Sequence, residues 1–372
     1  MVNSRLLIQP LLGCNVYISA GGSPRHIPFL LDILKKTQEH CAQLGGTSTS
    51  SGEPNISSHP TAPEETAVAN ACVVVHAFSD VVYNRSSIHL AANSEDAMAR
   101  VVIDLVQNAR SRLSQEEEQD DNTEFSSAPH HPSVGLVDHV SVMPLLLEKG
   151  KDEHDVTQDN QLQTPWGRTA RAIGTTMADT PNVAVFFYGD ADPHQTPLAT
   201  VRRDKTNFFQ SGGLLLDSDN AKTHVMDTAT VGAPPGFVEN YNIRLHACCD
   251  KKMAQSLTRA VRERNGGVAG VEALTLPYSQ GRYEVACNLL QPRVGSAECI
   301  QKKVDEWVQG QTSSTSQEEL VECAYRVGTT ASQCLEALEL ALEARELQQQ
   351  KQEQLERHNE SVWQQFKGYL SQ

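Results

Sequence analysis

The chain has 372 residues, more than one hydrophobic core usually spans, so its length predicts two domains with decorations. Its apolar runs have only strand length and its mean hydropathy is −0.40, which disfavours a transmembrane segment. The net charge of −15 disfavours nucleic acid and anionic membranes as partners, and nine scattered cysteines without a clear secretory signal favour a cytoplasmic protein with reduced thiols.

The first half of the chain shows strands and helices in the order β-α-β-β-α-β. The apolar periodicity predicts a strand over 13–20, a helix over 28–44, strands over 71–79 and 86–92, a helix that begins at Ser94, and a strand over 136–147. A further helix over 167–177 and a strand over 183–188 follow.

The second half repeats this order. The pattern predicts strands near 242–245, 268–276, 282–290 and 320–327, with helices capped by Asp250 and Ser296. Two α+β units of the split-βαβ, ferredoxin-like kind are therefore expected, each with an antiparallel sheet and helices on one face. A cleft between the units is the expected ligand site.

The composition places polar inserts and a tail around these units. Segments about 45–65, 114–129 and 149–163 are too polar to offset the entropy of ordering, so we expect disordered inserts there. We predict a first subdomain over 1–235, a second over 236–345 and a polar helical tail over 346–372.

A short stretch that begins at His131 is the strongest candidate for chemistry. Pro132 and Gly135 predict a tight turn before an apolar strand, and the turn would present His131 at the strand mouth. A histidine exchanges protons near neutral pH because its unperturbed pKa is about 6.5. The alternative is a loop histidine satisfied by backbone hydrogen bonds. No metal site is expected, because His130, His131, Asp138 and His139 do not follow a known ligand spacing.

Seven short motifs in fixed order resemble the formiminotransferase domain family. They are Cys14–Ser19, Phe78–Arg85, His131–Asp138, Phe187–Ala191, Thr230–Ala233, Asn240–Ile243 and Glu284–Leu290. The resemblance implies two ferredoxin-like subdomains around an electropositive folate tunnel. It also implies transfer of a formimino group from formiminoglutamate to tetrahydrofolate, which is the expected co-substrate.

The resemblance assigns roles to individual side chains. The histidine that matches His131 is the acid/base catalyst of the family, and Asp138 is expected to orient the imidazole or to be a simple turn carboxylate. Arg85, beside Asn84, is a candidate to bind a carboxylate of the substrate or of folate. The alternative is that Arg85 forms an ion pair at the surface. At Tyr188, Gly189 and Asp190, the end of a strand, the glycine would let a flat pterin approach the backbone closely. The alternative is that the chain simply leaves the sheet at this point.

Several positions depart from the family pattern. Ser133 follows His131-Pro132 where the family has an arginine, and Gly232-Ala233-Pro234-Pro235 lacks the basic residues of the related loop. Lys222 is expected to compensate as a folate-binding cation, together with Arg202, Arg203 and Lys205, although solvated surface positions are the simpler interpretation for each.

Two classes of function follow. The chain is expected to be either a folate-binding one-carbon transferase or a catalytically silent relative that acts as a binding or scaffold protein. The expected partners are a small one-carbon donor and folate, with no nucleic acid, no membrane and no metal, and a homodimer is an open alternative.

Overall fold

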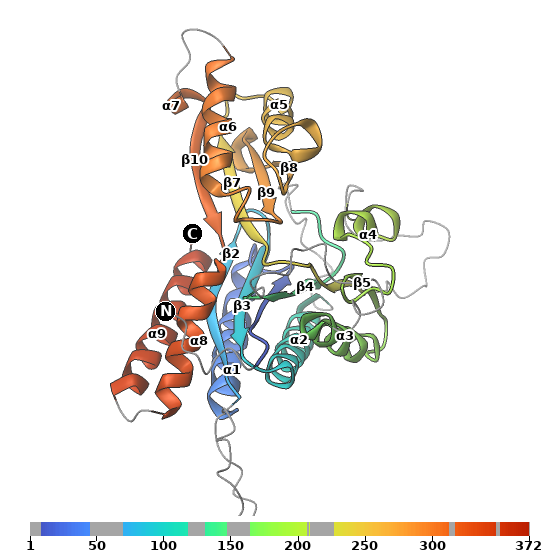
Figure 1. Cartoon of the computed structure of the whole chain (residues 1–372), viewed down its shortest axis with the longest axis vertical. Helices are drawn as coiled ribbons and strands as arrows, with labels where there is room; N and C mark the ends of the chain where they lie inside the picture. Colours follow the sequence, from blue (N-terminus) through green and yellow to red (C-terminus); the bar gives the residue numbers. More distant parts are fainter. Residues whose placement is uncertain are drawn as a thin grey trace, which may run out of the picture.

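The computed structural model describes residues 9–44, 70–117, 131–146, 164–206, 208, 227–311, 317–346 and 350–371. Within this part of the chain, the strands form one six-stranded and one four-stranded sheet. Figure 1 shows the four-stranded unit stacked above the six-stranded one, with the C-terminal helices α8 and α9 beside the lower unit.

The first sheet contains a complete split-βαβ unit. Its strands are β1 (Leu12–Ile18), β2 (Cys72–Asp80), β3 (Arg85–Ala92), β4 (Val137–Pro144), β5 (Val183–Gly189) and β6 (Asp227–Ala233). The spatial order is β2-β3-β1-β4-β6-β5, and the first four strands are antiparallel neighbours, as in a ferredoxin-like unit. Strand β6 then pairs in parallel with both β4 and β5, which widens the sheet.

The second sheet has the same arrangement. Its strands are β7 (Glu239–Leu245), β8 (Val271–Pro277), β9 (Tyr283–Leu289) and β10 (Val321–Val327). They lie in the order β10-β7-β9-β8, and each pair of neighbours is antiparallel. The second sheet carries helices α5 (Lys251–Val261) and α6 (Ala297–Gln309), and the first sheet carries a helical layer of its own. The four strands of the second sheet and the first four strands of the first sheet have the same order, so the prediction of two ferredoxin-like units is confirmed.

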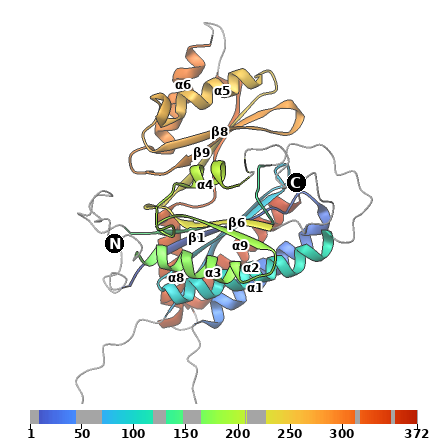
Figure 2. The ribbon, with the colours of Figure 1, turned by 90° about the vertical axis from the view of Figure 1, so that its right-hand side faces the viewer.

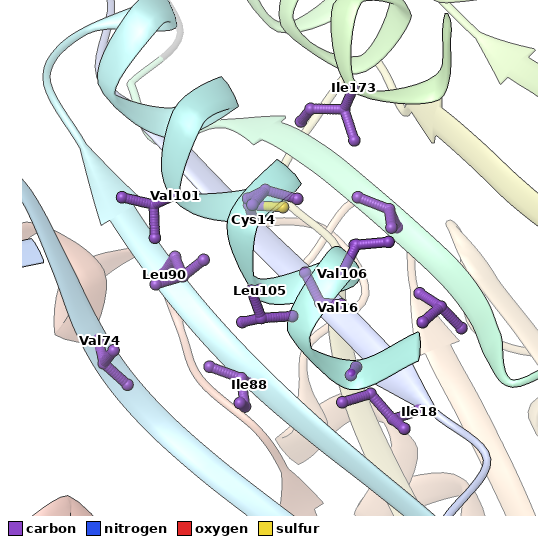
Figure 3. Packing of buried hydrophobic residues seen from close by; sticks show 14 of the residues in the cluster. Cys14, Val16, Ile18, Val74, Ile88, Leu90, Val101, Leu105, Val106 and Ile173 are labelled. Carbon is purple, nitrogen blue, oxygen red and sulfur yellow. The ribbon is translucent and has the colours of Figure 1, made fainter. Parts of the chain in front are cut away.

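The first helical layer packs on one face of the first sheet. It comprises α1 (Ile27–Gln43), α2 (Glu95–Glu117) and α3 (Pro165–Ala178), and Figure 2 shows these helices beneath the sheet. Cys14, Val16 and Ile18 alternate along β1 and point at α2, where Val101 and Leu105 meet them (Figure 3). Burial of each aliphatic side chain contributes roughly 1.5–3 kcal/mol, so this layer holds the sheet rigid beneath the polar face.

The opposite face of the first sheet is polar along much of its width. Tyr17, His89 and His139 lie on this face, from β1, β3 and β4. The second sheet also has one polar face, because Arg244 and Glu284 alternate with core residues such as Ile243. The Tyr17 hydroxyl donates a hydrogen bond to Asn240 Oδ1 of the second sheet at 3.2 Å. The two polar faces therefore contact each other.

Four other helices and three short 3-10 turns complete the described chain. The helices are α4 (Leu198–Asp204), α7 (Gln317–Leu320), α8 (Ala331–Glu346) and α9 (Gln350–Leu370), and the turns are Pro24–His26, Glu263–Asn265 and Ser279–Gly281. None of the described helices is long and apolar enough to span a lipid bilayer.

Helix α9 covers one edge of the first sheet. It runs beside the edge strand β2, and His358 Nε2 donates a hydrogen bond to the Val74 carbonyl oxygen at 2.9 Å. Val362, Phe366 and Leu370 are buried in the same core as α1. An open strand edge invites pairing with other chains, so α9 protects this edge.

The structure differs from the sequence predictions in four places. Helix α2 continues to Glu117, so the expected disordered insert over 114–129 begins inside a helix, and its remainder lies outside the described residues. Within segment 346–372, expected as a polar helical tail, helix α9 packs Val362, Phe366 and Leu370 into the core. Strand β6 and helix α4 were not predicted from the sequence. The expected inserts 45–65 and 149–163 lie outside the described residues.

The burial of α9 predicts a large stability effect at Phe366. Its side chain is fully buried, so Phe366→Ala should lower the free energy of unfolding by about 3–5 kcal/mol because a cavity forms. The exposed Gln364→Ala on the same helix should stay within about 0.5 kcal/mol. Chemical denaturation measures both, and equal stability of the two variants would show that α9 does not pack on the sheet.

Candidate functional site

A buried ion cluster lies on the polar face of the first sheet. Asp138 on β4 is fully buried, and its Oδ2 lies 2.7 Å from Arg85 Nη1 of β3 and 3.5 Å from Arg202 Nη2 of α4. Burial alone would raise the pKa of Asp138, but the charges of the two arginines outweigh it and hold the pKa well below its usual range. Two guanidinium groups thus surround one carboxylate, which leaves one positive charge uncompensated within this cluster.

The turn between β2 and β3 delivers Arg85 to this cluster. Asn84 adopts a left-handed backbone conformation with φ of 48°, and its Oδ1 accepts a hydrogen bond from the Gly22 amide at 2.7 Å. The Asn84 side chain also donates to the Ser19 carbonyl oxygen at 3.4 Å. The structure therefore gives Asn84 a local role in fixing the turn, and Arg85 begins β3 directly after it.

The turn before β4 presents His131 and Asp138 together. Asp138 Oδ1 accepts the Val134 amide at 2.9 Å, and Asp227 Oδ1 of β6 accepts the Leu136 amide at 2.9 Å. Gly135 has no space for a side chain, because a Cβ there would collide with Asp227 and with the backbone of β6. The glycine of the motif is thus explained by close packing against β6.

His131 lies beside the ion cluster, and its imidazole is neutral. Burial and the Arg85 charge lower the pKa of His131 to about 3. Its Nδ1 lies 2.6 Å from the Pro132 carbonyl oxygen. A carbonyl only accepts hydrogen bonds, so the proton resides on Nδ1 and Nε2 carries the free lone pair. The Tyr83 ring at 5.6 Å and the Phe208 ring at 6.1 Å contact the imidazole edge-on.

His139 and Tyr188 extend the polar face toward β5. His139 Nε2 lies 2.8 Å from the Tyr188 hydroxyl, and the His139 ring stacks on Tyr17 at 5.4 Å. Burial and the Arg202 charge hold the pKa of His139 well below its usual value. Burial also raises the pKa of Tyr188. The structure thus brings Tyr188 to the predicted site through His139, and Tyr188 itself is nearly inaccessible.

Gly189 and Asp190 have structural partners near helix α3. Gly189 has φ of +56°, and a Cβ there would collide with the Ala233 carbonyl of β6. Asp190 Oδ2 accepts hydrogen bonds from Trp166 Nε1 at 2.6 Å and from the Thr164 hydroxyl at 3.1 Å. The hydrogen bonds of Asp190 fix the start of α3. The contacts named for Gly189 and Asp190 do not involve the ion cluster.

The structure decides between the two sequence interpretations of Arg202, a folate-binding cation or a solvated surface position, only by excluding the second. The surface interpretation is contradicted, because Arg202 is buried and its guanidinium lies 4.1 Å from the centre of the Phe208 ring. Its Nε is buried without a hydrogen-bond partner among the described residues. Arg203 and Lys205, its neighbours on the chain, are exposed as expected. The available signal was the spacing of Arg202, which lies four residues after Leu198 and therefore on the same side of the short helix.

Two predicted residues stay outside the described part of the chain. These are Lys222 and His130, whose roles therefore stay predictions. Within the described residues, no group of three or more His, Cys, Asp or Glu side chains is arranged to hold a metal ion.

Comparison with known proteins finds a family model that matches the part of the chain that carries these side chains. Residues 62–229 match the formiminotransferase domain, N-terminal subdomain. The resemblance to the formiminotransferase family is confirmed over this range. The matched range contains Tyr83, Arg85, His131, Asp138 and Arg202, so the whole ion cluster belongs to the family region.

A relative and a solved structure were also found. A formiminotransferase cyclodeaminase-like protein of Arabidopsis thaliana is 28% identical over 246 residues, which cover 60% of this chain and 74% of that protein. The crystal structure of the periplasmic protease PqqL from Escherichia coli aligns with 95% of this chain and 41% of its own, at 10% identity and a TM-score of 0.19. At that score the structural likeness carries no information on fold or function.

The ion cluster predicts a large effect of Asp138→Asn. The change removes the charge that compensates Arg85 and Arg202 while keeping the side-chain shape, so the free energy of unfolding should fall by about 3–5 kcal/mol. Asp96→Asn is the matched control, because Asp96 pairs with Arg100 on an exposed helix and should matter by less than about 1 kcal/mol. Urea denaturation that ranks both variants alike would contradict this account of the cluster.

The lowered pKa of His131 predicts a pH dependence of stability. The unfolded chain binds a proton at this imidazole below about pH 6.5, whereas the folded chain does so only near pH 3, so acidification favours unfolding. His131→Phe should therefore flatten the loss of stability between pH 6.5 and 5 by up to about 1.4 kcal/mol per pH unit. Denaturation at several pH values measures this slope. An unchanged slope would mean that His131 titrates normally in the folded chain.

Proposed function

We propose that the chain is a folate-dependent one-carbon transferase of the formiminotransferase type, which moves a formimino group from formiminoglutamate to tetrahydrofolate. The observation that carries the proposal is the buried cluster of Arg85, Arg202 and Asp138 beside a neutral His131. The family match over the range that contains all four residues supports it.

The cluster fits a ligand that bears a carboxylate. Its one uncompensated positive charge favours an anion, and guanidinium groups bind carboxylates through paired hydrogen bonds. Arg202 Nε is buried without a hydrogen-bond partner among the described residues, so it has a donor to offer. Formiminoglutamate and tetrahydrofolate both carry glutamate carboxylates. Arg85 and Arg202 are therefore the residues we assign to a carboxylate of either molecule.

His131 has the protonation state that a general base needs. Tetrahydrofolate supplies the nitrogen nucleophile that receives the formimino carbon. The His131 Nε2 lone pair would take the proton released from that nitrogen, and the resulting imidazolium would return it to the departing glutamate amine. The Nδ1 hydrogen bond to the Pro132 carbonyl holds the ring in one tautomer throughout.

The same arginines that bind a carboxylate also control the basicity of His131. In the free chain, the Arg85 charge disfavours the imidazolium. A bound carboxylate would neutralise this charge and raise the pKa of His131, because an anion nearby favours the charged form of imidazole. Substrate binding would thus bring His131 closer to the pKa at which proton transfer is efficient.

The test combines binding and turnover. His131→Ala should lower the rate of formimino transfer by roughly 10²- to 10⁴-fold, because general acid/base groups contribute that much, and folinate binding should be retained. The control is His246→Ala, since His246 lies in the second unit at the end of β7 and outside the cluster. Calorimetry with folinate and a steady-state assay give the two readouts.

The outcomes separate the two classes of function. Binding and turnover that depends on His131 support the transferase. Folinate binding by the wild-type chain without turnover would instead support the silent binding protein, and absence of binding would contradict the folate assignment altogether.

A further inference from the structure

One of the contacts between the second unit and the candidate site runs through the aromatic side chain of Tyr278. Tyr278 follows β8, and its ring lies 5.2 Å from the Tyr83 ring in an edge-on contact. Tyr83 in turn contacts His131 edge-on at 5.6 Å, and the Tyr83 carbonyl oxygen accepts the His131 backbone amide at 3.3 Å. His131 is therefore separated from the second unit by a single buried residue.

Tyr278 rests on a rigid polar cluster of the second sheet. The Arg244 guanidinium lies 3.8 Å from the centre of the Tyr278 ring. Arg244 is held by Glu284, at 3.1 Å, and by the Tyr325 hydroxyl, at 2.8 Å. Glu284 is completely buried and also accepts hydrogen bonds from Asn242 at 2.7 Å and from Tyr325 at 2.8 Å. A cation held this firmly provides a fixed surface for the Tyr278 ring.

Tyr278 also contacts the turn that carries Tyr83. The Tyr278 side chain interacts with the Asp80 carboxylate and lowers its pKa against the larger, opposing effect of burial. Asp80 Oδ1 in turn accepts the Tyr83 amide at 2.9 Å. Only 5% of the Tyr83 surface is exposed, so its ring has little freedom to move independently. Tyr278 thus fixes both the backbone of this turn and the ring that touches His131.

We infer that Tyr278 is a positioning residue, through which the second unit holds Tyr83 against His131, limits the access of water to the imidazole and keeps it in one orientation. This inference rests on the proposed function for its effect on rate, and it stands independently of that function for its effect on His131 itself. Tyr278 does not touch His131, so its substitution changes the imidazole only through Tyr83.

The titration of His131 reports on this role directly. Among the described residues, the charged and titratable groups around the imidazole include Tyr83, Arg85 of β3, Asp138 and His139 of β4, and Arg202 of α4, and none of these lies on the second unit. Loss of the Tyr278 ring leaves these charges in place and admits water beside Tyr83. The desolvation that lowers the pKa of His131 should then weaken, and the pKa should rise.

The experiment compares Tyr278→Leu with Tyr278→Phe in the full chain. Nuclear magnetic resonance titration of the His131 imidazole should show a rise in pKa of at least about one unit for Tyr278→Leu and little change for Tyr278→Phe, which keeps the ring. The matched control is Tyr283→Leu, a tyrosine of the same sheet that packs on the opposite, helix-covered face. It should leave the His131 titration unchanged.

Turnover supplies a second readout. If the transferase is active, Tyr278→Leu should lower kcat by about tenfold with little change in KM, because small misplacement of a reacting group reduces the rate more than ground-state binding. Inactivity of the wild-type chain would count against the proposed function and would leave the titration as the test of the positioning role.

The result that overturns the inference is a folded Tyr278→Leu chain in which His131 titrates as in the wild type. If Tyr278→Leu does not fold, Arg244→Lys replaces it, since lysine keeps the charge toward Glu284 and removes the flat group under Tyr278. That variant should raise the His131 pKa in the same direction, and no rise would equally refute the role of the second unit.

Discussion

The burial of Asp138 between two arginines is the constraint on which the site depends. A carboxylate without access to water is stable only when it is paired, and here β3, β4 and α4 each contribute one charged group to the pairing. Both arginines favour the ionised carboxylate, and together they exceed its charge. Burial first, and then this excess positive charge, keep His131 and His139 neutral. One arrangement of buried charges therefore produces a cluster with excess positive charge, which attracts anions, and an imidazole with a free lone pair.

The two units contribute differently to this arrangement. All charged members of the ion cluster come from the first unit, whose apolar helical layer holds β3 and β4 in register. The second unit contributes a buried polar cluster around Glu284 and Arg244, which supports the turn before Arg85. Each sheet thus turns one apolar face to its helices. The other face of the first sheet combines the polar residues that meet the second sheet with a third apolar cluster, in which Val73, Ala91 and Met143 pack near α8.

The sequence predicts the parts of this structure that have a local signal. The alternation along β1 and the stripe of Val101 and Leu105 on α2 predict their elements because core contact follows the strand and helix periods. Strand β6 escapes prediction because it lies between two parallel neighbours and carries threonines on its polar face. The motif around His131 indicates the site, yet its pairing partners lie on separate elements. Arg202 is far from Asp138 in the chain, so only the tertiary fold reveals that it is buried.

The most direct test of the account is the affinity of the chain for a glutamate-bearing ligand with and without the Arg202 charge. Calorimetric titration of folinate into the wild-type chain and into Arg202→Met compares the two in the same buffer. The account predicts measurable binding by the wild type and an affinity at least about tenfold weaker for Arg202→Met, because a charged hydrogen-bond donor to the carboxylate is lost. Equal affinity of the two folded chains would contradict the assignment of this cluster as the carboxylate site.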